Sequence, residues 1–196
     1  MNSETITDIP LLRGPVALSH HFIRRFLHEG DRAVDATCGN GSDTLLLAEL
    51  VGSSGRVWAF DIQQAAIDRS FQRLTEAGLA ERVKLIRAGH ETLSGHVTDN
   101  ISLVVFNLGY LPGGDRSIIT NPETTAKALE MSHACLKPGG ILAVTIYPGH
   151  DGGERERHVV ESWSAGLDAR AFHVWRMGQL NVPADAPYFI LIQKAA

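Results

Sequence analysis

The sequence predicts an α/β protein with a seven-stranded, mostly parallel β-sheet that ends in a C-terminal antiparallel hairpin. Apolar strand-like runs alternate with helical patterns along the chain, and a glycine-rich turn follows the first buried run. The last two strand patterns follow each other with no helical pattern between them. At 196 residues the chain fits one domain over 1–196, with 1–14 as an N-terminal extension.

Periodicity and turn residues define the expected elements. Pro15 opens a helix over 16–28, Gly30 ends it, and the first strand runs to Asp35. Asn121 and Pro122 give an N-cap and a first-turn proline to a later helix. Further helices are expected over 42–51, 64–77, 121–136 and 154–167, and strands over 56–61, 83–87, 101–107, 141–146, 172–177 and 188–193.

Composition narrows the function classes. Hydrophobic content of 44% and charged content of 20% are ordinary for a globular protein, and no apolar run is long enough to cross a bilayer. With no signal-peptide pattern, and with Cys38 and Cys135 lacking metal-ligand or redox spacing, we expect a cytoplasmic protein with reduced thiols, no metal and no membrane partner. The net charge of −4 argues against tight, sequence-blind nucleic-acid binding, so RNA binding would need a local basic patch.

The glycine-rich turn and the second strand indicate a nucleoside-cofactor site. Gly39 and Gly41 allow a sharp turn and close approach of a ligand to the backbone. Asp61 ends the second strand, where a carboxylate can accept two ribose hydroxyls.

Two details favour S-adenosylmethionine over a dinucleotide. Thr44 stands where the dinucleotide fingerprint needs its third glycine. Asp35 would repel a pyrophosphate and attract the ammonium and sulfonium groups of S-adenosylmethionine. The alternatives are a nucleotide-binding oxidoreductase, and an ordinary strand–helix turn with a solvated acid at Asp61.

The loops after the later strands carry further candidates. His90 and Glu91 could contact adenine, or could form a helix-capping turn with His90 surface-exposed. Asn107 and Tyr110 are similar to the Asn-Pro-Pro-Tyr motif of amino-group methyltransferases, with other residues replacing the prolines; the alternative is that Tyr110 only packs. His150 could contact phosphate or accept a proton, or be merely solvated; a hydrolase triad is disfavoured because no Gly-x-Ser-x-Gly elbow accompanies it.

Several of these motifs together resemble the YtqB/MnmM family, also known as rRNA methylases. The matching stretches, from about Asp31 onward, are 35–44, 60–67, 89–91, 106–115, 124–125 and 147–153, of which Asn-Leu-Gly-Tyr-Leu-Pro-Gly-Gly-Asp is the most specific. The resemblance implies a class I (Rossmann-like) methyltransferase. Its members transfer a methyl group from S-adenosylmethionine to the amine of 5-aminomethyl-2-thiouridine at the tRNA wobble position. The implied product is 5-methylaminomethyl-2-thiouridine, and the implied partner is the anticodon loop of tRNA.

Site roles follow from the resemblance residue by residue. Asn40 and the turn of Gly39 and Gly41 would hold the methionine part, and Asp61 and Gln63 the ribose and adenosine; His90 and Glu91 would flank adenine. Asp35, Ser42 and Asp43 are also expected to bind the cofactor. From the chemistry of the transfer we further expect Asn107 to orient the amine and Tyr110 to support the base; no strong general base is required, although Asp115 or His150 could accept the released proton. The chain departs from the family pattern at 181–188 and in its N-terminal extension.

Three classes stay open at this point: a tRNA methyltransferase, a methyltransferase of rRNA or a small molecule, and a non-methylating binder of S-adenosylmethionine or a nucleotide. Cofactor binding separates the third from the others, and product identity separates the first two. The sequence leaves a homodimer open. The candidate phosphate contacts, each of which could instead be a solvated surface charge, are Arg24, Arg25, Arg116, Arg155 and Arg157.

Overall fold

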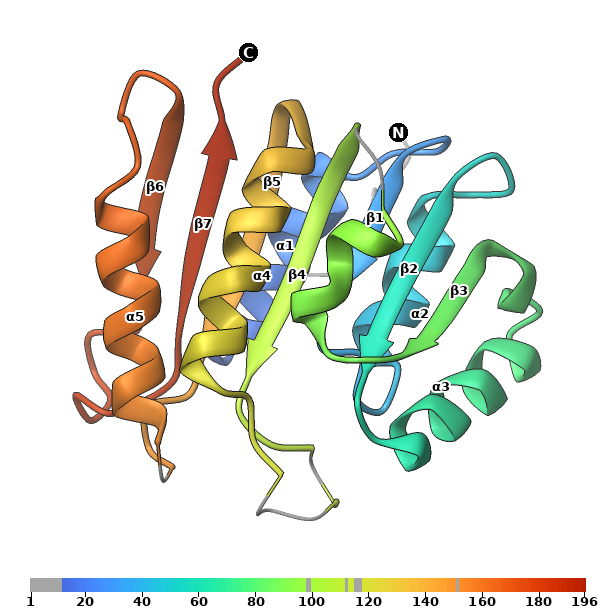
Figure 1. Ribbon diagram of the computed structural model, residues 1–196, viewed down its shortest axis with the longest axis horizontal. Helices are drawn as coiled ribbons and strands as arrows, with labels where there is room; N and C mark the ends of the chain where they lie inside the picture. Colours follow the sequence, from blue (N-terminus) through green and yellow to red (C-terminus); the bar gives the residue numbers. More distant parts are fainter. Residues whose placement is uncertain (1–11, 98–99, 112, 115–117, 151) are drawn as a thin grey trace, which may run out of the picture.

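Seven strands form one sheet in the order β3-β2-β1-β4-β5-β7-β6 in the computed structural model (Figure 1), which describes residues 12–97, 100–111, 113–114, 118–150 and 152–196. Strand β7 pairs antiparallel with both neighbours, while the pairs among β1 to β5 are parallel. The predicted fold class is therefore confirmed. The strands are β1 (Arg32–Asp35), β2 (Arg56–Asp61), β3 (Val83–Arg87), β4 (Ile101–Leu108), β5 (Leu136–Ile146), β6 (Phe172–Met177) and β7 (Tyr188–Lys194).

Helices cover both faces of the sheet (Figure 1). One layer contains α1 (Gly14–Phe26), α2 (Ser42–Leu50) and α3 (Gln64–Glu76), and the other contains the 3₁₀ helix η2 (His90–Gly95), α4 (Pro122–Cys135) and α5 (Gly153–Ala165). Strand β4 shows why: Leu103 and Val105 point into one apolar cluster, and Val104 and Phe106 into the other. Alternate residues of a strand face opposite sides, so a central strand that is apolar throughout needs helices on both faces.

The observed elements differ from the expected ones where the backbone departs from simple periodicity. The helix expected to reach residue 136 ends at Cys135, and β5, expected over 141–146, already begins at Leu136. The β4–β5 register shifts there, because Ile101 pairs with Leu136 while Leu103 pairs with Ile141. Two 3₁₀ helices not assigned from the sequence, η1 (Ala80–Arg82) and η2, flank β3.

The strand order places a crevice at the carboxyl ends of β1 and β4. The chain moves outward from β1 to β2 and β3, then returns to place β4 on the other side of β1. Ligands of doubly wound sheets bind at such a switch point, because the loops from the two strands diverge. No helix in the described ranges is long and apolar enough to cross a membrane.

Candidate active site

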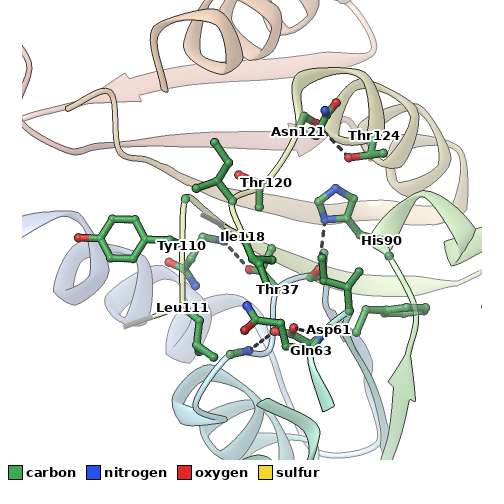
Figure 2. Close-up of a pocket in the computed structure, with 18 of the residues that line it drawn as sticks. Thr37, Asp61, Gln63, His90, Tyr110, Leu111, Ile118, Thr120, Asn121 and Thr124 are labelled. Atoms are coloured by element: carbon green, nitrogen blue, oxygen red, sulfur yellow. Dashed lines mark hydrogen bonds between the residues drawn. The ribbon is translucent and has the colours of Figure 1, made fainter. Parts of the chain in front are cut away.

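A cavity of about 300 Å³ opens at this switch point (Figure 2). It collects residues from the loops after β1, β2, β3 and β4 and from the segment that leads into α4. Its polar and ionisable lining residues include Thr37, Asp61, Gln63, His90, Glu91, Asn107, Tyr110, Thr120, Asn121 and Thr124.

The turn after β1 owes its shape to its two glycines. Gly39 and Gly41 have φ values of +52° and +76°, a region that residues with a Cβ rarely adopt. A Cβ on Gly41 would lie 2.7 Å from Ser70 Oγ, so this glycine lets α3 pack against the turn. Gly39 lines the cavity, and its N–H donates to Asp61 Oδ2 at 3.0 Å.

The side chain of Asp61 is held in place by a backbone N–H group at each of its two carboxylate oxygens. Its Oδ2 accepts from Gly39, and its Oδ1 accepts from the N–H of Gln63 at 2.9 Å. Figure 2 shows Asp61 and Gln63 together on one wall of the cavity. A carboxylate has about four acceptor positions, so Asp61 can accept further bonds from ligand hydroxyls while these two remain.

His90 is buried, at 6% exposure, so the alternative of a surface-exposed His90 is wrong. Its Nδ1 lies 3.3 Å from the carbonyl oxygen of Ala36, and its ring packs edge-on against Phe106. Burial lowers the pKa of His90, so the ring is neutral near pH 7. His90 and Glu91 both line the cavity; their contact with adenine stays a prediction.

Asp35 is fully buried beneath the turn and is not among the cavity-lining residues of the described chain. Its carboxylate accepts from Thr37 N–H at 3.1 Å and from Thr44 Oγ1 at 2.6 Å. Burial and then the negative charge of Asp43 raise the pKa of Asp35 to about 7. Asp35 therefore stabilises the turn. It can attract a cationic cofactor only through its electrostatic field, without direct contact.

Two other predicted cofactor residues face α3. Asn40 Oδ1 accepts from Arg69 at 3.0 Å, and Ser42 Oγ accepts from Arg73 at 2.6 Å. Within the described residues, neither side chain belongs to the cavity lining, and the same is true of Gly41 and Asp43. Their cofactor roles stay predictions.

Asp43 connects α2 to the end of β4. Its side chain is nearly buried, and its Oδ2 accepts from Asn107 Nδ2 at 2.6 Å. The backbone N–H of Asn107 also donates, to Thr37 Oγ1 at 2.7 Å. Because a carboxylate can only accept, the amide nitrogen of Asn107 must face Asp43 and its Oδ1 must point elsewhere. Asn107, itself a lining residue, can thus offer a hydrogen-bond acceptor to a ligand.

Tyr110 lines the cavity, and His150, which is not among the lining residues of the described chain, lies next to Tyr110. Tyr110 is 39% exposed, and its ring meets the His150 ring edge-on at a centroid distance of 6.2 Å. Figure 2 shows Tyr110 across the cavity from His90. Asp115, the other predicted proton acceptor, lies outside the described residues, as does Arg116.

The wall formed by residues 118–121 was missed by the sequence analysis. Thr120 belongs to this wall, and its Oγ1 donates to the buried carboxylate of Glu156 at 2.6 Å. Thr125 Oγ1 donates to the other oxygen of Glu156 at 2.6 Å. Burial raises the pKa of Glu156. Nothing in the sequence separates Glu156 from the solvated acids of the same helix, because its burial depends on how α4 and α5 pack.

The predicted phosphate contacts fall into two groups. Arg155 pairs with Glu123 at 3.2 Å and Arg157 with Glu154 at 2.7 Å, so neighbouring acids offset their charges. Arg24 and Arg25 are exposed in the last turn of α1. Among the described residues, no group of three or more His, Cys, Asp or Glu side chains could hold a metal ion.

Fold and site together define the class. A sheet with this strand order, an acid at the end of β2 and an Asn at the end of β4 are features of a class I methyltransferase dependent on S-adenosylmethionine. The family model described as "Putative rRNA methylase" matches residues 57–193, and the chain belongs to this family. The family expected from the motifs is thereby confirmed.

Individual relatives agree with this assignment. The tRNA (mnm(5)s(2)U34)-methyltransferase, chloroplastic, of Arabidopsis thaliana is 39% identical over 187 residues, which are 90% of this chain and 68% of that protein. The crystal structure of a "putative rRNA-methylase" from Clostridium thermocellum superposes with a TM-score of 0.91 at 43% identity, covering 94% of this chain and 99% of that one. The Streptococcus mutans protein SMU.1697c, solved in complex with SAH, gives a TM-score of 0.85 at 35% identity, with 94% and 99% covered. The protein is therefore an S-adenosylmethionine-dependent methyltransferase, as predicted.

Proposed function

We propose that this enzyme methylates the amine of 5-aminomethyl-2-thiouridine at the wobble position of tRNA, giving 5-methylaminomethyl-2-thiouridine. The observation that carries the proposal is the Asn107 side chain, which lines the cavity with its amide nitrogen bound to Asp43. The amide oxygen is then available to accept a hydrogen bond from a primary amine. The Arabidopsis relative is named for the same modified uridine.

The cavity residues suit the cofactor. We assign the ribose hydroxyls to Asp61, whose carboxylate is already oriented by the backbone of Gly39 and Gln63. His90, neutral and buried, and Glu91 are assigned to the adenine side, and the turn at Gly39 to the methionine side. When bound, S-adenosylmethionine supplies a methyl group on a sulfonium, which is already a strong electrophile.

The protein's task in the reaction is chiefly alignment. In the transfer, the bond between the methyl carbon and sulfur breaks as the bond from the neutral amine nitrogen to that carbon forms. Asn107 would hold the amine in line with this bond, and such positioning can supply much of a rate enhancement. The methylated nitrogen carries one surplus proton, for which His150, next to Tyr110, or Asp115 is the proposed acceptor.

The rim is suited to a splayed-out RNA base. Tyr110 is exposed beside the cavity, and proteins that read single-stranded RNA stack bases on such rings. We assign the partner to the anticodon loop, where the wobble base is unpaired. Arg155 and Arg157 are weak candidates for phosphate contacts because neighbouring acids offset their charges, and Arg24 and Arg25 lie in the last turn of α1, which leads to the start of β1 and not to the cavity edge of the sheet. We also propose that the protein is cytoplasmic and forms a homodimer.

The test is a methylation assay with tRNA from cells that lack the final wobble methylation. Nucleosides are analysed by mass spectrometry after incubation with the protein and S-adenosylmethionine. We expect a gain of one methyl group on 5-aminomethyl-2-thiouridine alone, lost in Asp61→Ala. Methylation of ribosomal RNA and not tRNA would favour the second candidate, to which the family description points.

A further inference from the structure

Asp43 binds a second partner besides Asn107, and this partner comes from α1. His20 Nε2 lies 2.6 Å from Asp43 Oδ1, while Asn107 Nδ2 lies 2.6 Å from Asp43 Oδ2. We propose that His20 and Asp43 are positioning residues that hold the Asn107 amide in the single orientation that permits methyl transfer. This inference rests on the proposed function, because it uses the role of Asn107 at the amine.

Hydrogen-bond chemistry fixes the direction of both contacts. An ionised carboxylate has acceptors only, so His20 must carry a proton on Nε2 and Asn107 must present its NH₂ group. If the Asn107 amide flipped, its oxygen would face a carboxylate oxygen at 2.6 Å, and its NH₂ group would face the N–H groups of the substrate amine. The flipped amide could still meet a nitrogen lone pair, but that lone pair is the one needed for attack on the methyl group.

The contact between His20 and Asp43 is important because the Asp43 side chain is buried. Only 8% of the Asp43 side chain is exposed, so water cannot readily replace a lost donor at Oδ1. A buried acceptor left without a donor is destabilised, and more so when it is charged. Without His20, the Asp43 carboxylate would lose the donor at Oδ1 and could rotate away from the geometry that holds the Asn107 amide. Burial, and then the negative charge of Asp43, raises the pKa of the neighbouring Asp35, so charge in this region is poorly solvated.

The contact also gives α1 a role in the site. His20 lies outside the stretch matched by the family model, and α1 packs on β5 and β7, away from the strands that carry the cofactor turn. Its side chain is 30% exposed, so it reaches Asp43 from the surface side. The orientation of a cavity residue on β4 is thereby set by a helix that contributes no residue to the described cavity lining.

The kinetic test compares His20→Phe, which keeps a ring but removes the donor, with His20→Gln, which keeps an NH donor. The control is His21→Phe, since His21 is an exposed neighbour on the same helix. We expect His20→Phe to lower kcat about 10- to 100-fold, with the Kd for S-adenosylmethionine and the melting temperature nearly unchanged, and His20→Gln to restore most of the rate. Equal losses in both His20 variants, together with a lower melting temperature, would mean a purely structural role.

A spectroscopic test needs no RNA substrate. The side-chain NH₂ pair of Asn107, assigned by its disappearance in Asn107→Asp, is followed by ¹⁵N NMR of the full chain with S-adenosylmethionine bound. We expect a downfield, slowly exchanging proton that is lost in Asp43→Ala and in His20→Phe but kept in His21→Phe. An unchanged pair in His20→Phe would overturn the inference. If the wild-type protein does not methylate tRNA, the proposed substrate fails, and this measurement still decides the role of His20.

Discussion

Asn107 at the end of β4 donates its amide N–H to Asp43 near the start of α2, at 2.6 Å between Nδ2 and Oδ2. The two residues are 64 positions apart, and each lies at the edge of the sheet where the cofactor turn and the proposed amine site meet.

Asn107→Ala should reduce turnover far more than cofactor binding. The change removes the proposed acceptor for the amine but leaves Asp61, Gln63 and His90 in place. A loss of about 100-fold in kcat is expected for a misaligned amine, with little change in the Kd for S-adenosylmethionine measured by calorimetry. An equal loss in both quantities would assign Asn107 to the cofactor.

Asp61→Ala should show the opposite pattern, with a loss of cofactor affinity. The variant removes the proposed ribose acceptor and also the partner of Gly39 N–H. Hydrogen bonds to a charged group contribute about 1.5–3 kcal/mol, so the Kd should rise about ten-fold or more. Asp68→Ala is the matched control, because Asp68 bonds to Gln64 on the exposed side of α3. A Kd unchanged in Asp61→Ala would remove Asp61 from the cofactor site.

Gly41→Ala should destabilise the protein more than Gly78→Ala. Both glycines have positive φ, which costs an alanine about 1–2 kcal/mol. The Gly41 Cβ would also meet Ser70 at 2.7 Å, whereas nothing lies within 4 Å of a Cβ on Gly78. The free energy of unfolding in urea should therefore fall further for Gly41→Ala. A similar decrease in the free energy of unfolding in the two variants would mean that α3 moves to accommodate the added methyl group without a measurable penalty.

Asp35→Asn should flatten the dependence of stability on pH. The folded-state pKa of Asp35 is raised from 3.8 to about 7, so the folded protein holds a proton that the unfolded chain releases between these values. This group therefore favours folding most below about pH 4, and its contribution declines as the pH rises through 7. An Asn can keep both contacts, because Thr44 Oγ1 can accept from its NH₂ group. Urea unfolding at pH 5 and pH 8 should show a smaller difference for Asp35→Asn than for the wild type, while Asp68→Asn should match the wild type.

Thr120→Val should weaken RNA binding through the cavity wall. The hydroxyl of Thr120 ties the 118–121 segment to Glu156, and Thr125 makes the equivalent bond from within α4. Loss of either bond leaves a buried carboxylate oxygen with one donor fewer, so both variants should lose stability. Only Thr120→Val should also raise the KM for RNA, since Thr120 lines the cavity and Thr125 does not. A raised KM for RNA in both variants would show that the effect comes from a general loss of stability and not from the cavity wall.

Local patterns predicted much of the fold. Strands β2, β3 and β6 have the bounds expected from the sequence, and Asn121 caps α4 by accepting from the N–H of Glu123 at 2.9 Å. These features depend on neighbours a few residues apart: apolar runs, a capping side chain and a proline in the first helical turn. The start of β5 at Leu136 was not predictable in this way, because it depends on the pairing of Leu136 with Ile101 of β4, across a register shift from the pair of Ile141 and Leu103.

The candidate site shows the same division. The sequence alone determined that a glycine-rich turn follows β1 and that an acid ends β2, because the order of elements in a doubly wound sheet brings such groups to one edge. Only the tertiary structure decided that Asp43 faces Asn107 and His20, that His90 is buried, and that Glu156 anchors the 118–121 segment. Each of these depends on where a helix packs against the sheet, and that packing depends on the summed contacts of side chains from the whole chain.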